Sequence, residues 1–198
     1  MGLFDKLQKL GKALESVNEV AEDISRSTVK DYGAPVYSLY TALRLGDLHS
    51  RIDITDEQGT VKYYTKSSVI AIKGKTEIMD AEENVIAHLE KRPVSLHEKH
   101  FITMADGRKF TLSNELFHVV RDITNIEGLG WQMQGNFIGL TFNLLDEKGE
   151  PVATVGKKAV SIHDNYRIDI YQPAQEQVVV AIVIQLEKML EARRANDN

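Results

Sequence analysis

The sequence predicts a mainly β protein that encloses one buried helix near its C-terminus. Three observations support this fold class. Short stretches of alternating apolar and polar residues recur from Val36 onward, turns rich in Asp, Gly and Asn separate them, and the apolar stretch VVVAIVI covers 178–184. Alternation with period two is typical of strands that are buried on one face. Roughly ten to twelve such strands at short spacing predict a closed barrel or a sandwich.

The composition is that of an ordinary globular domain. The chain has 198 residues, of which 42% are hydrophobic and 27% are charged, and its net charge is −5. A chain of this length can bury a substantial core without disulfide bonds. The acidic balance argues against nucleic acid as a partner, because binding to nucleic acid requires a basic face. The absence of cysteine excludes disulfide bonds, thiol nucleophiles and cysteine-ligated metal sites.

Residues 1–31 are predicted to form an amphipathic helical arm and a linker. Apolar residues recur there at alternating spacings of four and three, which is the pattern of a helix with a nearly heptad seam. The stripe consists of Leu3, Leu7, Leu10, Leu14, Val17, Ala21 and Ile24.

Two interpretations of this arm stay open. In the first, its apolar residues, which include Phe4, enter an anionic phospholipid surface while lysines meet the headgroups; those lysines are Lys6, Lys9 and Lys12. In the second, the arm contacts protein, either by self-association as a coiled coil or against its own barrel. We expect a cytoplasmic protein, peripherally membrane-associated in the first interpretation, because the N-terminus has no continuous apolar core typical of a signal peptide.

The chain from 32 to 194 is predicted to be one β domain with internal repeats, followed by a disordered tail at 195–198. Each repeat has a strand, a tight turn, a strand, an acidic turn and a further strand. The acidic turns read DEQG, DAEEN, ADG and DEKG, and they contain Asp56, Asp80, Asp106 and Asp146. Asp, Gly and Asn suit such turns because they tolerate left-handed backbone and bond their own backbone. We therefore interpret these acids as structural and not as catalytic pairs.

The stretch QVVVAIVIQLEKML, from Gln177, is predicted to be a buried helix. It is much too short to cross a bilayer, which takes roughly 20 apolar residues. A helix that is apolar on every side must be buried all round, and in a β protein the inside of a barrel can bury it. Glu176 at its start and Arg193 and Arg194 near its end match the helix dipole. The expected core residues are Val178, Val179, Val180, Ile182, Val183, Ile184, Leu186, Met189 and Leu190.

Two long stretches resemble the LURP-one-related family, which is allied to the tubby C-terminal domain and the phospholipid scramblases. They read WQMQGNFIGLTFNLLDEKGEPVATVGKK and SIHDNYRIDIYQPAQEQVVVAIVIQLEKML, and the resemblance runs from about Tyr37 to Leu190. It implies a twelve-stranded antiparallel tubby-like barrel around a central hydrophobic C-terminal helix. Tubby domains bind phosphoinositide headgroups, and scramblases act at membranes. This chain has no basic motif that matches a headgroup site, and the palmitoylated cysteines of scramblases have no counterpart.

Other candidate sites have structural interpretations that we prefer. His97 and His100 have a spacing that could hold a metal ion on a helix, but His97 occupies the same repeat position as His163, in a strand–turn–strand unit. Trp131 is interpreted as a core residue. The basic residues near turns and strand ends are interpreted as a solvated surface rather than a lipid-binding patch; they are Lys73, Lys75, Lys91, Arg92, Lys157 and Lys158. We expect no catalytic residue, cofactor or metal ion.

The sequence favours a non-enzymatic intracellular binding or scaffold module. Its expected partners are an anionic membrane surface, phospholipid headgroups or a protein. The alternative is a lipid carrier or an enzyme that uses a cavity in the barrel. A central helix would leave little room for a substrate, whereas an empty, polar-lined cavity would favour the alternative.

Overall fold

The computed structural model describes residues 30–43, 51–67, 75–94, 97–113, 123–157 and 166–196. They form twelve strands, a short 3-10 helix, η2 (Pro173–Gln175), and a long helix, α2 (Glu176–Asn196). The strands are β1 (Tyr37–Leu43), β2 (Ile52–Thr55), β3 (Val61–Ser67), β4 (Lys75–Asp80), β5 (Val85–Val94), β6 (His97–Met104), β7 (Lys109–Ser113), β8 (Ile123–Asn125), β9 (Gln132–Asn136), β10 (Thr141–Leu145), β11 (Pro151–Lys157) and β12 (Tyr166–Ile170).

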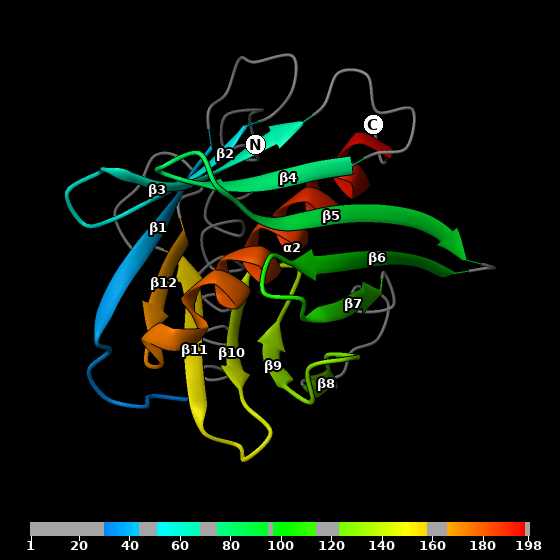
Figure 1. The fold of residues 1–198 in the computed structure, drawn as a ribbon. Helices are drawn as coiled ribbons and strands as arrows, with labels where there is room; N and C mark the ends of the chain where they lie inside the picture. The colour runs from blue at the N-terminus through cyan, green and yellow to red at the C-terminus, as the bar shows by residue number, and fades with distance from the viewer. Residues whose placement is uncertain are drawn as a thin grey trace, which may run out of the picture.

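All twelve strands belong to one antiparallel sheet, in the order β7-β6-β5-β4-β3-β2-β1-β12-β11-β10-β9-β8. Consecutive strands from β1 to β7 are neighbours, as are consecutive strands from β8 to β12, and β1 pairs with β12 to join the two runs. The outermost strands are β7 and β8, and an isolated antiparallel bridge connects Thr111 in β7 to Glu127, which follows β8. In Figure 1 α2 crosses the middle of the view, with strands of the sheet on both sides of it. The predicted mainly β fold, with twelve antiparallel strands and a C-terminal helix, is confirmed.

The period-two pattern of the sequence becomes an inward and an outward face of the sheet. In β12 the side chains of Tyr166, Ile168 and Ile170 are buried, whereas Arg167 between them is exposed. Leu39 lies opposite Ile168 in the β1–β12 register and is buried with it. Alternate side chains of a strand point to opposite faces, so β1 and β12 each contribute inward apolar side chains to a common core.

Three of the predicted acidic turns have the same geometry. One carboxylate oxygen of Asp56 accepts hydrogen bonds from the backbone N–H groups two and four residues ahead, at 3.0 and 2.8 Å. Asp80 repeats this pattern at 3.0 and 2.8 Å, and Asp146 repeats it at 2.9 and 3.0 Å. The turn of Asp106 differs, because this residue accepts bonds from the backbone and the guanidinium of Arg108. The prediction that these acids bond their own backbone is confirmed.

Helix α2 forms the centre of the core. The side chains of all seven residues from Val178 to Ile184 are 0% exposed. Valine and isoleucine favour strands on propensity, but burial on all sides outweighs this preference. Each buried side chain of this size contributes about 1.5–3 kcal/mol, so together they rival the net stability of a domain, about 5–15 kcal/mol. The remaining predicted core residues of the helix, Leu186, Met189 and Leu190, are also buried.

Candidate functional site

The segment that leads into α2 is held by hydrogen bonds from distant parts of the sheet. Gln172 donates through its amide to the Asp146 carboxylate at 3.1 Å and to the Pro151 carbonyl at 3.2 Å. The guanidinium of Arg108 donates to the Gln175 side chain at 2.6 Å. These contacts attach the start of the helix to the β10–β11 and β6–β7 hairpins.

The hairpins β2–β3 and β4–β5 lie at the first turn of α2. Their turns, which contain Asp56 and Asp80, line a cleft together with the first turn of α2 and the start of β1. The cleft has a volume of about 570 Å³ and is open to solvent. We take this cleft as the candidate functional site, because it is a solvent-open hollow at the start of the central helix.

The lining of the cleft is strongly acidic. Five carboxylates line it, and the only basic residue among the described lining residues is Lys62. The acids are Asp56, Glu57, Asp80, Glu82 and Glu176. A concave surface lined by charges of one sign concentrates the electrostatic field and attracts ions of the opposite sign. The cleft therefore favours a positively charged group and disfavours a phosphate.

Glu176 is the first residue of α2 and accepts hydrogen bonds from two tyrosines. The hydroxyl of Tyr37 in β1 donates to one carboxylate oxygen, and the hydroxyl of Tyr63 in β3 donates to the other. Burial raises the pKa of both hydroxyls above their usual value, and the hydrogen bond to the Glu176 carboxylate and its charge raise the pKa further. Both tyrosines are therefore neutral hydrogen-bond donors at physiological pH, and they fix the carboxylate at the base of the cleft.

Hydrogen bonds also favour the charged form of other carboxylates around this end of the sheet. The Asn84 side chain and nearby backbone N–H groups lower the pKa of Asp80, outweighing its desolvation. The amide of Gln172 lowers the pKa of Asp146 in the same manner. The Asp80 carboxylate thus stays ionised within the acidic cleft at neutral pH.

The structure places the other predicted residues as follows. The arm residues Leu3, Phe4, Lys6, Leu7, Lys9, Leu10, Lys12 and Leu14 lie outside the described residues, as do Lys73, Lys158 and His163. Trp131 is buried in the core, as predicted. Arg92 pairs with Glu90 at 2.8 Å. Within the described part of the chain, no three His, Asp or Glu side chains are arranged to hold a metal ion.

His100 occupies a buried position that the sequence interpretation did not anticipate. Its Nδ1 atom lies 3.0 Å from the side-chain nitrogen of Gln185 in α2, so this histidine faces the helix from β6. His97, the other member of the predicted pair, begins β6 opposite Val94 in β5. Both residues lie in strand β6, so the helical geometry for which this spacing could suit a metal site does not occur here.

Sequence reasoning missed the cluster of Tyr37, Tyr63 and Glu176. Glu176 was interpreted only as an acid that matches the helix dipole, and the tyrosines were not singled out. The available signal was an acidic residue two positions before the wholly apolar stretch 178–184. Such a carboxylate, drawn to the edge of a core, needs hydrogen-bond donors from elsewhere in the fold.

No described helix is both long and apolar enough to cross a membrane.

Comparisons with known proteins agree with this fold. The model of a family described as LURP-one-related matches residues 39–187. The X-ray structure of a protein from Arabidopsis thaliana superposes with a TM-score of 0.51 at 15% sequence identity, covering 79% of this chain and 93% of that chain. At this identity the similarity shows the fold alone. No curated protein matches the sequence.

Proposed function

This chain belongs to the LURP-one-related family, and on that premise we propose that it is a non-enzymatic binding module whose ligand enters the acidic cleft. The observation that carries the proposal is the position of α2. Its fully buried stretch from Val178 to Ile184 occupies the interior, which leaves the cleft at the first turn as the concave surface open to a partner.

We also infer that the sheet closes into a barrel around α2, along a seam between β7 and the chain after β8. The N–H of Thr111 donates to the carbonyl of Glu127 at 2.9 Å, and Lys99 in β6 pairs with the Glu127 carboxylate at 3.1 Å. At Gly128 the backbones approach so closely that a Cβ atom would lie 2.5 Å from the carbonyl oxygen of Lys109. These contacts support closure at this seam.

The charge of the cleft identifies the class of ligand. Glu57 and Glu82 project from the tips of the two free hairpins and are exposed, and Glu176 lies at the base. We propose that a basic side chain of a partner protein enters between them. An anionic phospholipid headgroup does not suit this lining, so a membrane contact of this protein belongs to residues 1–31 and not to the cleft.

The alternative of a lipid carrier or enzyme receives less support. The cleft is polar, which is the property that would favour an enzyme, but from α2 only the tyrosine-bound Glu176 and Gln177 line it, and the buried stretch of the helix does not. A carrier needs an apolar lumen of several hundred Å³ for a lipid chain. The side chains of α2 fill the corresponding volume of the core.

Titration of the full-length ¹⁵N-labelled protein, followed by NMR, tests the proposal. A tetralysine peptide should shift the amide signals of the Asp56 and Asp80 turns, whereas inositol hexakisphosphate should not. The double substitution Glu57→Gln and Glu82→Gln should weaken peptide binding by about two- to thirtyfold, since each exposed charge pair typically contributes about 0.2–1 kcal/mol.

Glu147→Gln is the matched control. Glu147 follows Asp146 just as Glu57 follows Asp56 in a turn of the same geometry, but it lies outside the cleft lining. This substitution should leave peptide binding unchanged. Equal weakening of peptide binding by the control and the double variant would contradict a specific role of the cleft. If inositol hexakisphosphate shifts the amide signals of the Asp56 and Asp80 turns, the positive charge assigned to the ligand is wrong.

A further inference from the structure

Strand β10 is buried on both of its faces. Its inward side chains, Phe142 and Leu144, belong to the core. The side chains between them, Thr141, Asn143 and Leu145, point outward by strand alternation and are nevertheless buried. By contrast, the alternate residues of β7 are half-buried or exposed. The outer surface of β10 is therefore shielded from solvent, as the outer surface of β7 is not.

Asn143 shows how complete this shielding is. Its side chain is only 1% exposed, and neither its amide nitrogen nor its carbonyl oxygen has a hydrogen-bond partner. An exposed asparagine would bond to water, whereas a buried amide without partners destabilises the fold by roughly 1–3 kcal/mol. Something covers this residue and excludes water from it.

The outward surface around Asn143 carries no charge. In the sheet register Asn143 lies between Gln134 in β9 and Thr154 in β11. The outward residues of these three strands are uncharged; they are Gln132, Gln134, Asn136, Thr141, Asn143, Leu145 and Thr154. The outward residues of β4 and β5 include Glu77, His88 and Glu90. The surface over β9–β11 can therefore be covered without burying a charge, whereas covering the surface over β4–β5 would bury charged side chains, which is more costly.

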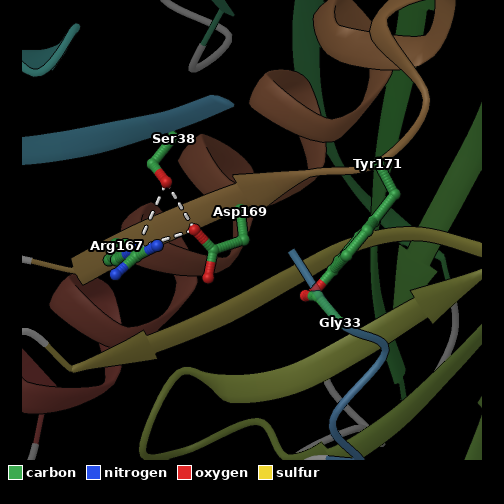
Figure 2. A network of polar contacts seen from close by, with 5 residues as sticks. All are labelled: Gly33, Ser38, Arg167, Asp169 and Tyr171. Atoms are coloured by element: carbon green, nitrogen blue, oxygen red, sulfur yellow. Dashed lines mark hydrogen bonds and ion pairs between the residues drawn. The ribbon is translucent and has the colours of Figure 1, made fainter. Parts of the chain in front are cut away.

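The described chain begins beside this surface. The N–H of Val36 donates to the carbonyl of Ile170 at 2.8 Å, and the ring of Tyr32 packs edge-on against that of Tyr171, with centroids 6.1 Å apart. Figure 2 shows Tyr171 extending to Gly33, whose carbonyl accepts a hydrogen bond from its hydroxyl at 3.4 Å. The N–H of Tyr171 in turn donates to Val152 in β11, at 3.0 Å.

We propose that residues 1–29 of the same chain dock on the outward surface of β9–β11. Their predicted helix carries an apolar stripe, which brings no charge onto this uncharged surface, and the segment ends three residues before Tyr32, whose ring packs on Tyr171 beside β11. As a helix, this segment would measure roughly 40 Å at 1.5 Å per residue, which is more than the roughly 17 Å of a five-residue strand. The docked stripe would be hidden from a membrane, so docking and vesicle binding compete. This inference does not depend on the ligand of the cleft.

The lack of cysteine permits a direct test in the full-length protein. A nitroxide spin label is attached to Lys9→Cys, on the polar face of the predicted helix, and the NMR signals of the β-sheet amides are recorded. We expect at least twofold broadening for amides of β9–β11 and none for β4–β6. A label on the exposed side chain of His88→Cys in β5 is the control and should produce the reverse pattern.

A mixture of spin-labelled protein without ¹⁵N and ¹⁵N-enriched protein without a spin label distinguishes docking within one chain from docking of a second copy. Broadening of β9–β11 in the mixture would show that a second copy docks there and would overturn the intrachain proposal, as would the absence of broadening in the singly labelled protein. Leu10→Lys should abolish the broadening without altering the barrel. Retention of the broadening in this variant would contradict docking through the apolar stripe. Because the substitution lies in the arm, loss of the broadening cannot be attributed to misfolding of the barrel.

Discussion

The buried stretch of α2 and the cleft at its first turn adjoin at Gln177, but opposite kinds of interaction stabilise them. From Val178 to Ile184 the helix makes apolar contacts on every side. Two residues earlier, Glu176 is held by two tyrosine hydroxyls, and acids from two hairpin turns line the same cleft. Apolar burial supplies most of the stability of a domain, whereas exposed charges add little. The comparison teaches that this fold can vary its binding surface without loss of its core.

The largest expected effect is on the core side of this comparison. Ile182→Asp places a charge without a partner at a position that is 0% exposed, which costs several kcal/mol in addition to the lost apolar burial. We expect the variant to lose cooperative thermal unfolding, measured by circular dichroism. Ile138→Asp is the control, because Ile138 is 51% exposed and should tolerate the charge. A cooperative, near-native melt of Ile182→Asp would contradict the central role of α2.

The second effect concerns the seam that would close the sheet around the helix. Gly128 has a φ of 96°, and a Cβ atom there would meet backbone atoms of Lys109 and Phe110. Gly59, in a turn at the cleft, has a φ of 83° with nothing within 4 Å of that position. Gly59→Ala should lower the free energy of unfolding by about 1–2 kcal/mol through backbone strain alone. Gly128→Ala should lower it clearly more, as measured by urea denaturation; equal losses would show that the seam is not tightly packed.

The third prediction tests the tyrosine-bound carboxylate at the boundary of the two regions. The folded state keeps the Tyr37 and Tyr63 hydroxyls protonated above about pH 10, the usual tyrosine pKa, because their pKa values are raised. Their contribution to stability is therefore fully present below about pH 10 and is lost as the pH rises towards the folded-state pKa values.

Glu176→Gln should weaken this pH dependence, because it removes the negative charge that helps to raise both pKa values. It should also lower stability near neutral pH by about 1–3 kcal/mol, the usual value of hydrogen bonds to a charged group. Urea denaturation at pH 8 and pH 11, with tyrosinate absorbance as a second readout, measures both effects. If Tyr37 and Tyr63 in this variant still ionise at a higher pH than the other tyrosines, burial alone sets their raised pKa values.

The smallest effect is expected in a turn at the cleft. Glu83 has a φ of 65° at the position that Gly59 and Gly149 occupy in the equivalent turns. Glu83→Gly should raise the free energy of unfolding by up to about 1 kcal/mol, since it relieves left-handed strain that outweighs the added flexibility of the unfolded chain. The neighbouring Glu82→Gly, where φ is not positive, should instead be mildly destabilising. Thermal melts of the two variants with opposite shifts would support this account.

Patterns along the chain predicted the strands, the acidic turns and the buried helix because each depends on neighbouring residues. Alternation assigned the inward rows, for example Tyr166, Ile168 and Ile170 in β12. The spacing of Asp and Gly predicted turns in which Asp56 bonds amides only two and four residues away. The helix followed from a run of apolar residues that no other part of a β fold could bury on all sides.

Only the tertiary structure decided where the candidate site lies and which strand is shielded outside. Glu176 meets Tyr37 across 139 residues and Tyr63 across 113 residues of sequence, and the pairing of β1 with both β12 and β2 sets these distances in space. Asn143 resembles any outward polar residue in the sequence, yet its side chain is buried and without a partner. Local patterns fix how a strand alternates, but the sheet register and the packing between distant elements determine which side chains meet, and neither leaves a signal in neighbouring residues.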